Sequence, residues 1–336
     1  MKKLSVSYIL GIYNAERTLK DCLNGIFMQD FPKKDYEVIV IDGGSTDSTI
    51  QIVKGFMKKH KNLKLLHNPK KLSEGKGMSK DMGVKASKGD LLIFLDHDNI
   101  VLGKNWLKKM IFPFEDDQEI MATQSFLQFK ENNSNFLKYV NALGVEDAFA
   151  VPYSLVAQVT LHPKKFNLIK NNYYSYVLNK NPVLFGGANG CIFKKEVFKR
   201  IGGYTRDVNN FESMADQAMK VAVVKNAKVY HNTGSNFLIF LKKKALYFYR
   251  FIDYGYKEEN YKWVGPKFRD KIEFYLRVML NLTVLVPFVI GLKQFIKTKR
   301  FFWLLHPFYV FTMTALYSVL TLYSIKSYFK YVSKKD

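Results

Sequence analysis

Apolar residues in the first hundred positions follow two patterns that alternate along the chain. The predicted strands are short apolar runs at residues 5–10, 37–41, 63–66 and 91–95, and the predicted helices, at residues 16–29, 49–57 and 77–86, have apolar residues three and four positions apart. The two spacings distinguish helices from strands, and continuous apolar runs bounded by turn residues indicate fully buried strands. This alternation predicts an α/β fold in which a mainly parallel sheet is covered by helices on both faces.

Acidic residues stand directly after two of these predicted strands. Asp42 follows the run EVIVI and opens the turn Asp-Gly-Gly-Ser-Thr-Asp, and Asp96 and Asp98 follow the run LLIFL. In open α/β sheets, ligands bind beyond the carboxyl ends of the strands. Two carboxylates two positions apart repel each other unless a cation lies between them, and such oxygen ligands suit Mg²⁺ or Mn²⁺ on a diphosphate. Asp42 alone can also be read as the first residue of an ordinary capped turn.

Three features farther along the chain are weaker signals. A glycine-rich turn at residues 186–190 precedes an apolar run, and Asp216 precedes another apolar segment. His231 follows a short apolar run and therefore also stands at a predicted strand end. From the residues alone, a helix-capping role for Asp216 and a structural role for His231 stay open.

Two strongly apolar segments stand near the C-terminus. Residues 301–325 carry no acidic or basic side chain other than His306. At ~1.5 Å per residue they are long enough to cross a hydrocarbon core of about 30 Å. Residues 278–292 are shorter and contain Pro287, which fits a short span, a re-entrant segment or an interfacial helix. Equal numbers of basic residues flank the segments on every side, so their orientation stays open.

Composition narrows the class of protein. Of 336 residues, 48% are apolar and 15% aromatic, which excludes a disordered chain, and two cysteines exclude a disulfide framework. We expect both thiols to be free. The net charge of +23 indicates a phosphate-bearing partner. Only seven of the 52 basic residues are arginine, however, and arginine is the side chain that binds phosphates and bases with two parallel hydrogen bonds. The basic residues around the apolar C-terminal segments favour an anionic membrane surface over nucleic acid.

Five stretches of the chain, in this order, resemble the family-2 glycosyltransferases. They are SYILGIYNAERTLKDCLNGIFMQDFP, EVIVIDGGSTDST, SEGKGMSKDMGVKASKGDLLIFLDHD, NPVLFGGANGCIFKKEVFKRIGGY and MADQAMK. The resemblance covers about residues 3–231. It implies the GT-A fold, a nucleotide-diphospho-sugar transferase fold with a Rossmann-like mixed sheet, here followed by C-terminal membrane helices.

The resemblance implies a role for each matching position. The nucleotide-sugar-binding residues are Glu16, Asp42, Lys76, Lys80 and Asp96, the metal ligands are Asp96, Asp98 and His231, the acceptor side includes Gly187 and Asn189, and the catalytic base is Asp216. The implied cofactor is Mn²⁺ or Mg²⁺. One base beside the acceptor hydroxyl suffices for a single displacement that inverts the anomeric carbon.

Five positions depart from the family pattern. Ile12 lacks the usual hydroxyl, Gly43 stands where a second acid is common, Ala215 replaces the Glu that often precedes the base, and Lys80-Asp81 replaces Arg-Asn. Because Asp96, Asp98 and Asp216 are unaffected, these departures concern the identity of the donor more than the activity.

We therefore expect a GT-A catalytic domain at residues 1–235, a basic and aromatic juxtamembrane segment at 236–271, two transmembrane or membrane-associated helices within 272–325, and a basic tail at 326–336. The expected function is metal-dependent, inverting transfer of a sugar from a nucleotide-diphospho-sugar to a hydroxyl of a lipid-linked or cell-surface glycan. The expected partners are this donor, the acceptor and an anionic membrane leaflet, without nucleic acid. The expected location is the cell membrane, with the catalytic domain facing the cytoplasm.

Three alternatives stay open. A polyprenyl-phosphate glycosyltransferase would share the membrane helices but would not need Asp216 as a base. A sugar nucleotidyltransferase would share the fold but would open with a glycine-rich loop, which the residues around Gly11 do not form. A non-enzymatic protein that binds anionic membranes or nucleic acid would explain the charge but not the ordered acids at strand ends.

Overall fold

The structure is a computed structural model that describes residues 4–70, 73, 75–180, 182–187, 189–231, 236–250 and 268–332. The chain divides into two compact units. The sheet unit comprises Met1–Lys130 and Tyr153–Thr233, and the helical unit comprises Glu131–Pro152 and Gly234–Asp336. Parts of the predicted juxtamembrane segment 236–271 and of the predicted tail 326–336 lie outside the described residues.

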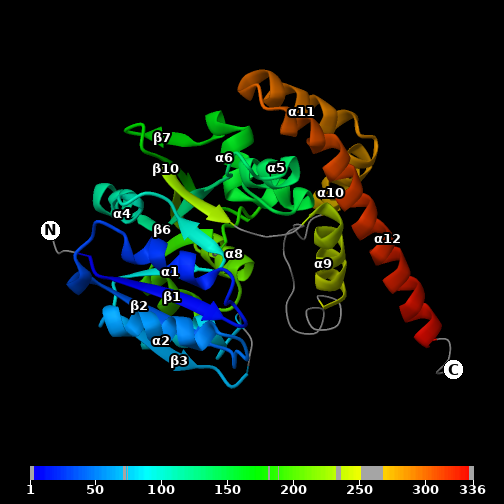
Figure 1. Ribbon diagram of the computed structural model, residues 1–336. Coiled ribbons are helices and arrows are strands. Elements are labelled where there is room, and N and C mark those ends of the chain that lie inside the picture. Colours follow the sequence, from blue (N-terminus) through cyan, green and yellow to red (C-terminus); the bar gives the residue numbers. More distant parts are fainter. Residues whose placement is uncertain are drawn as a thin grey trace. The chain divides into compact units, whose positions relative to one another are not determined.

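One mixed sheet organises the sheet unit (Figure 1). Its described strands are β1 (Val6–Ile12), β2 (Tyr36–Asp42), β3 (Leu63–His67), β4 (Leu91–Leu95), β5 (Asn99–Val101), β6 (Ile120–Gln128), β7 (Asn167–Ile169), β8 (Tyr173–Val177), β9 (Asn189–Lys194) and β10 (Lys220–His231). They lie in the order β3-β2-β1-β4-β9-β6-β10-β8-β7, and β5 pairs with β10. The four strands predicted from the apolar runs are confirmed.

The directions of the strands bring several strand ends to one edge of the sheet. β1 is parallel to β2 and β4, β9 is antiparallel to both β4 and β6, and β6 is parallel to β10. It follows that β1, β2, β4, β6 and β10 all end at the same edge, where β9 begins. We call this edge the carboxyl edge.

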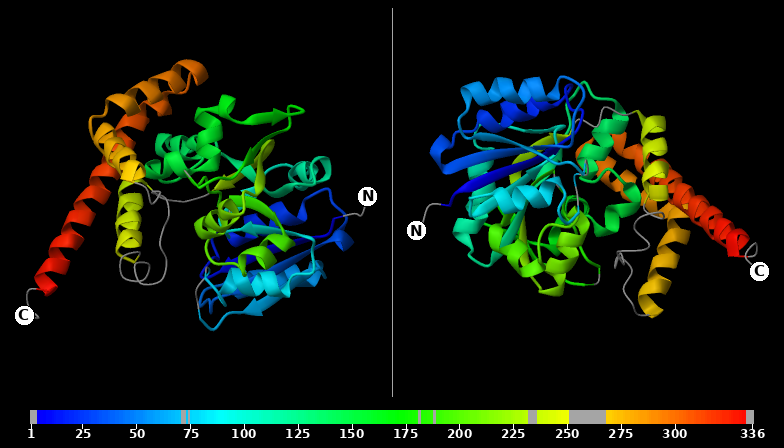
Figure 2. Two further views of the ribbon diagram at one scale, coloured as in Figure 1. Left: turned by 180° about the vertical axis from the view of Figure 1, so that it is seen from behind. Right: turned by 90° about the horizontal axis from the view of Figure 1, so that it is seen from below.

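Helices cover both faces of the sheet (Figure 2). One face carries α1 (Leu19–Phe27), α2 (Thr49–Lys59) and α4 (Trp106–Asp116), and the other carries α3 (Ser79–Ala86), α6 (Leu155–Leu161), α7 (Lys195–Ile201) and α8 (Asp207–Asp216). The short helices η1 (Lys33–Asp35) and η3 (Pro163–Lys165) lie between elements of this unit. Tyr8 and Leu10 of β1 face the first core and Ile9 the second. Because successive side chains of a strand alternate between faces, a strand buried on both faces reads as one continuous apolar run.

Both cysteines are buried inside these cores and unpaired. Cys22 belongs to α1 and Cys191 to β9, and each is a free thiol. Burial raises the pKa of both thiols. The prediction of free thiols is confirmed, and their surroundings make them packing residues.

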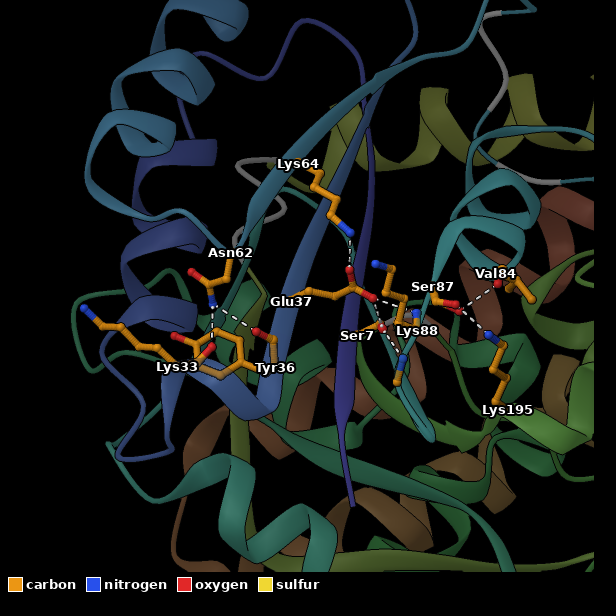
Figure 3. Close-up of polar contacts among 11 residues, drawn as sticks. Ser7, Lys33, Tyr36, Glu37, Asn62, Lys64, Val84, Ser87, Lys88 and Lys195 are labelled. Atoms are coloured by element: carbon orange, nitrogen blue, oxygen red, sulfur yellow. Dashed lines mark hydrogen bonds and ion pairs between the residues drawn. The ribbon is translucent and has the colours of Figure 1, made fainter. Parts of the chain in front are cut away.

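Glu37 connects neighbouring segments by hydrogen bonds at the edge of the sheet opposite the carboxyl edge (Figure 3). Its carboxylate accepts hydrogen bonds from the Ser7 hydroxyl at 2.8 Å, the Lys64 ammonium at 2.7 Å and the Lys88 backbone N–H at 2.6 Å. Burial alone would raise the pKa of Glu37, but these donors outweigh burial and lower it. Since the partners lie on β1, on β3 and in the turn before β4, one side chain on β2 joins all of its neighbours.

The helical unit pairs residues 131–152 with the C-terminal helices. Its elements are α5 (Asn135–Leu143), η2 (Ala148–Tyr153), α9 (Phe237–Arg250), α10 (Phe268–Leu282), α11 (Leu285–Thr298), η5 (Phe301–Leu305) and α12 (His306–Val332). The Tyr139 hydroxyl lies 2.7 Å from Nδ1 of His306, and the Tyr309 hydroxyl donates to the Glu146 carbonyl at 2.8 Å. These buried contacts explain why α5 belongs with helices that are distant in the sequence.

Membrane-length helices are found at the C-terminal end of the described residues. The segment Phe301–Ser324 is long and apolar enough to cross a membrane, with a mean hydropathy of 1.3. Lys271–Leu282 and Leu285–Thr298 pass the same test only as a pair, and the chain bends by 71° between them. Val284 stands at this bend with a φ of 66°. By length and composition, the described part of the chain holds one candidate span, or two if the bent pair counts as one.

Two helical glycines provide a matched test of the packing. A Cβ atom on Gly83 of α3 would lie 2.3 Å from Cγ2 of the fully buried Ile9, whereas a Cβ atom on Gly55 of α2 would meet nothing within 4 Å. We expect Gly83→Ala to lower the free energy of unfolding by roughly 1–3 kcal/mol through overpacking. Gly55→Ala should raise it by about 0.5–1 kcal/mol, because alanine loses less backbone entropy in a helix. Denaturant unfolding measures both, and equal stability of the two variants would contradict the close approach of α3 to β1.

Candidate functional site

Hydrogen bonds join the turns that follow β1 and β2 at the carboxyl edge. The side-chain carbonyl of Asn14 accepts from the Thr46 N–H at 2.9 Å, and the Glu16 carboxylate accepts from the Ser48 N–H at 3.0 Å. Asn14 has a φ of 47°, in the left-handed region where asparagine is enriched. Glu16, predicted to contact the nucleotide, therefore lies beside the turn that Asp42 opens.

The buried Asp42 carboxylate is used within its own turn. It accepts hydrogen bonds from the Gly44 N–H at 2.8 Å, the Ser45 N–H at 3.1 Å and the Ser45 hydroxyl at 2.5 Å. These hydrogen bonds are the ones expected of a capped turn. Contact of Asp42 with a nucleotide stays a prediction.

A buried lysine connects two carboxylates at the carboxyl edge. Lys80 of α3 is only 1% exposed, and its Nζ lies 3.3 Å from Oδ1 of Asp96 and 3.6 Å from Oδ2 of Asp207. A buried ammonium is costly unless it is paired with opposite charge and hydrogen-bonded. Lys80 and Asp96, both predicted to bind the donor, are thereby brought together, and Asp207 joins them.

Asp98 and His231 meet because β5 pairs with the end of β10. Asn99 of β5 is the register partner of His231, and Nε2 of His231 lies 3.3 Å from Oδ2 of Asp98. Burial would raise the pKa of Asp98, but the hydrogen bond and the charge of His231 outweigh it and lower the pKa. His97, which stands between Asp96 and Asp98 in the sequence, does not take part: its Nδ1 lies 2.8 Å from the Thr18 hydroxyl. Two of the three predicted metal ligands are therefore neighbours.

The glycine-rich turn before β9 lies next to Asp207. The Gly187 N–H donates to Oε1 of Gln124 at 3.1 Å, and a Cβ atom on Gly187 would lie 3.9 Å from Oδ2 of Asp207. Asn189 begins β9 and pairs with Leu95, the residue before Asp96. Both predicted acceptor-side residues thus belong to the carboxyl edge.

Among the contacts that the structure describes, Asp216 pairs with Lys180 and not with another predicted site residue. It is the last residue of α8, its side chain is 42% exposed, and its Oδ1 lies 3.0 Å from Nζ of Lys180. β10 begins shortly after it, at the edge opposite the one where β10 ends at His231. Lys76 is exposed in the turn before α3.

Sequence reasoning missed Asp207 and Tyr204. The Tyr204 hydroxyl donates to Oδ1 of Asp207, and the Tyr204 ring centroid lies 5.8 Å from Nζ of Lys80. The glycine pair Gly202-Gly203 was a signal in the sequence, because glycine favours the left-handed conformation in which a helix ends and the chain reverses. Their φ values are 81° and 105°, and α7 ends just before them. Asp207 is the first acidic residue after this reversal, and it begins α8 at the carboxyl edge.

The chemistry of Asp98 and His231 fits a divalent cation. Within the residues that the structure describes, no group of three or more His, Cys, Asp or Glu side chains gathers closely enough to hold a metal ion. Mg²⁺ and similar ions are commonly bound through one or two protein ligands, with substrate phosphates and water completing the shell. The Asp98 carboxylate meets that requirement for Mn²⁺ or Mg²⁺, and the His231 imidazole lies beside it.

The fold and the strand-end acids define a class of protein, and comparison with known proteins names the family. Glycosyl transferase family 2 matches residues 7–202, and the chain belongs to this family. It is therefore a glycosyltransferase, and the predicted family and GT-A fold are confirmed.

Individual relatives agree with this assignment. An uncharacterized glycosyltransferase of Methanocaldococcus jannaschii is 24% identical over 305 residues, covering 89% of this chain and 96% of that protein. A poly(ribitol-phosphate) beta-glucosyltransferase of Bacillus spizizenii is 30% identical over 117 residues, which are 35% of this chain but 18% of that protein. The mannosyltransferase PcManGT from Pyrobaculum calidifontis, solved with GDP-Man and Mn²⁺, has a similar fold: TM-score 0.57 and 13% identity, covering 94% of this chain and 87% of that chain.

Asp81 provides a test of how the site is held. Its carboxylate accepts hydrogen bonds from the Gly77 N–H at 2.8 Å, the Tyr204 N–H at 3.1 Å and the Lys85 ammonium at 2.7 Å. Burial alone would raise the pKa of Asp81, but these donors lower it. Its contribution to stability is therefore complete above the unfolded-state pKa of about 3.9 and is lost as the pH falls through the lower native value.

We expect Asp81→Asn to lower the free energy of unfolding at pH 7 by about 1–3 kcal/mol. The difference from the wild type should shrink once the pH falls below about 4. Urea unfolding at a series of pH values measures this, with Asp30→Asn, an exposed carboxylate paired with Lys108, as the control. A difference that does not change with pH would contradict the ionic role of Asp81.

Proposed function

We propose that this glycosyltransferase moves a sugar from a nucleotide-diphospho-sugar to a hydroxyl group of a lipid-linked or cell-surface glycan, with inversion and with Mn²⁺ or Mg²⁺ as cofactor. The observation that carries the proposal is the contact of Asp98 with His231 at the edge where Asp42, Asp96 and the glycine-rich turn also lie. Acids gathered at the carboxyl ends of parallel strands are positioned for a cation and a bound diphosphate.

Asp98 and His231 would hold the cation. When bound, it would neutralise charge on the departing diphosphate as a Lewis acid. Nε2 of His231 and Oδ2 of Asp98 lie 3.3 Å apart, which is close enough for both atoms to contact one ion. The similarly folded mannosyltransferase was solved with GDP-Man and Mn²⁺, which supports the same kind of donor and cofactor here.

The nucleotide sugar would lie along the joined turns after β1 and β2. The side chain of Asp96 is 40% exposed although Lys80 holds one of its oxygens, so it can accept a hydrogen bond from a ribose or sugar hydroxyl. The exposed Lys76 can approach the diphosphate. Asp42 and Glu16 would act mainly by holding the shape of the two turns, through the hydrogen bonds that they accept there.

The helical unit would attach the enzyme to the membrane. Large apolar side chains on three helices are exposed, among them Leu276 and Met279 of α10, Phe288 and Val289 of α11, and Val319 and Leu322 of α12. Lys293, Lys297 and Lys299 accompany the apolar residues of α11. Exposed apolar surface beside lysine fits an anionic leaflet, with about 1 kcal/mol gained per basic residue near it. The catalytic unit would face the cytoplasm, where the donor is present.

The metal site can be tested by nucleotide binding. We expect Asp98→Asn and His231→Ala to weaken Mn²⁺-dependent binding of UDP or GDP roughly tenfold or more. Binding in the absence of metal should not change. Titration calorimetry measures the affinity for the nucleotide, and electron paramagnetic resonance measures the concentration of free Mn²⁺. Asp30→Asn is the control. If Asp98→Asn binds nucleotide with the full Mn²⁺ dependence of the wild type, the assignment is wrong.

Membrane attachment can be tested with paired charge substitutions. Val289 on α11 and Val319 on α12 are each 63% exposed, and Val177 on β8 is 50% exposed. A charge within a hydrocarbon layer costs about 2.5–3.5 kcal/mol, so Val289→Glu/Val319→Glu should reduce co-flotation with phosphatidylcholine–phosphatidylglycerol vesicles at least about tenfold. Val177→Glu should float like the wild type. Equal flotation of all three proteins would exclude these helices as the membrane-binding surface.

A further inference from the structure

The acidic residues at the two ends of α8 point in different directions and lie far apart. Asp207 is the first residue of this helix and Asp216 the last. At 3.6 residues per turn and 1.5 Å per residue, the step between them is two and a half turns and about 13 Å, so the side chains leave opposite sides of the helix. One acceptor hydroxyl cannot be in contact with both.

Asp207 is the acid that faces the donor side of the site. Its Oδ2 lies 3.6 Å from Nζ of Lys80, which in turn lies 3.3 Å from Oδ1 of Asp96. Lys80 therefore bridges a predicted donor-binding carboxylate and Asp207, and the three charged groups form one connected cluster.

Asp216 faces the other end of the sheet. Its partner Lys180 follows β8, whose last residue Val177 pairs with Lys220, the first residue of β10. His231 is the last residue of the same strand, on the order of 30 Å away at about 3.3 Å per residue. Asp216 is thus remote from the pair that would hold the cation.

The side chain of Asp207 is 23% exposed, so an acceptor hydroxyl can reach the carboxylate from solvent. Its Oδ1 accepts a hydrogen bond from the Tyr204 hydroxyl, and this contact fixes the plane of the carboxylate. Beside Oδ2 stands Gly187 of the glycine-rich turn, where even a Cβ atom would come within 3.9 Å. Because residue 187 is glycine, no side chain of the turn occupies that position beside Oδ2.

We propose that Asp207, rather than Asp216, is the base that deprotonates the acceptor, with Lys80 and Tyr204 as positioning residues. The inference rests on the proposed function, because it assigns a residue to that reaction. As the acceptor oxygen forms its bond to the anomeric carbon, its proton passes to Oδ2 of Asp207. The bond from that carbon to the diphosphate oxygen breaks, and its electron pair leaves with the diphosphate. Asp207 later returns the proton to water.

Matched variants at the two ends of α8 test the assignment. Release of nucleoside diphosphate from UDP-glucose, UDP-N-acetylglucosamine and GDP-mannose is measured with Mn²⁺ and with water as the acceptor, on the full chain. General-base catalysis contributes about 10²- to 10⁴-fold, so Asp207→Asn should lower kcat at least about 100-fold while its affinity for UDP or GDP stays within about threefold. Asp216→Asn should retain kcat within about threefold. Full activity of Asp207→Asn, or a 100-fold loss in Asp216→Asn, would overturn the inference.

An anionic nucleophile separates loss of a base from loss of structure. Azide attacks the anomeric carbon without giving up a proton, so it does not need a base. We expect azide to restore turnover of Asp207→Ala with formation of a glycosyl azide, detected by mass spectrometry, and to leave the wild-type rate unchanged. No gain with azide in a variant that still binds nucleotide would contradict the role as proton acceptor.

Tyr204→Phe tests the positioning of Asp207. It removes the hydrogen bond to Oδ1 and should lower kcat several-fold with an unchanged KM for the donor. A change confined to KM would place Tyr204 on the donor side and contradict this role. If the wild type binds none of the three nucleotide sugars, the proposed function itself fails, a result distinct from full activity of Asp207→Asn.

Discussion

The common direction of β1, β2, β4, β6 and β10 is the constraint on which the site depends. Antiparallel β9 lies between β4 and β6, so these two strands run the same way although they do not touch. As a result, Asp42, Asp96 and His231 emerge at one edge from strands that are far apart in sequence. Reversal of β2, β4 or β10 would move Asp42, Asp96 or His231 to the opposite edge of the sheet, where Glu37 lies.

Burial of Lys80 is the second requirement, because it links the two sides of the site. An ammonium with 1% exposure is stable only beside anions, and Asp96 and Asp207 meet this need from β4 and α8. The next residue, Asp81, binds the backbone of Tyr204 and so anchors the loop that delivers Asp207. Where the family usually has Arg-Asn, this chain has Lys-Asp, a compact cation next to an acid that holds the loop.

Local patterns were sufficient for the first half of the sheet. Continuous apolar runs predicted the strands that lead to Asp42 and Asp96, and the family resemblance singled out Asp98 and His231, which lie 3.3 Å apart. The family resemblance also gave Asp216 as the base, and Asp207 was not among the residues that the sequence singled out. Asp207 has no local signal of comparable strength. Tyr204 reaches it through the reversal of the chain at Gly202-Gly203, and Lys80 reaches it through an ion pair between α3 and α8.

The sequence by itself determined that this is an α/β glycosyltransferase with acids at its strand ends and apolar helices at its C-terminus, because periodicity and strand-end motifs are local properties of the chain. Only the tertiary structure decided which acids share a site. A helix of two and a half turns directs its first and last side chains to opposite sides, and the direction of β9 decides which edge the glycine-rich turn occupies. Residues 131–152 likewise group with the C-terminal helices through buried contacts of Tyr139 and Tyr309, and no local sequence pattern predicts these contacts.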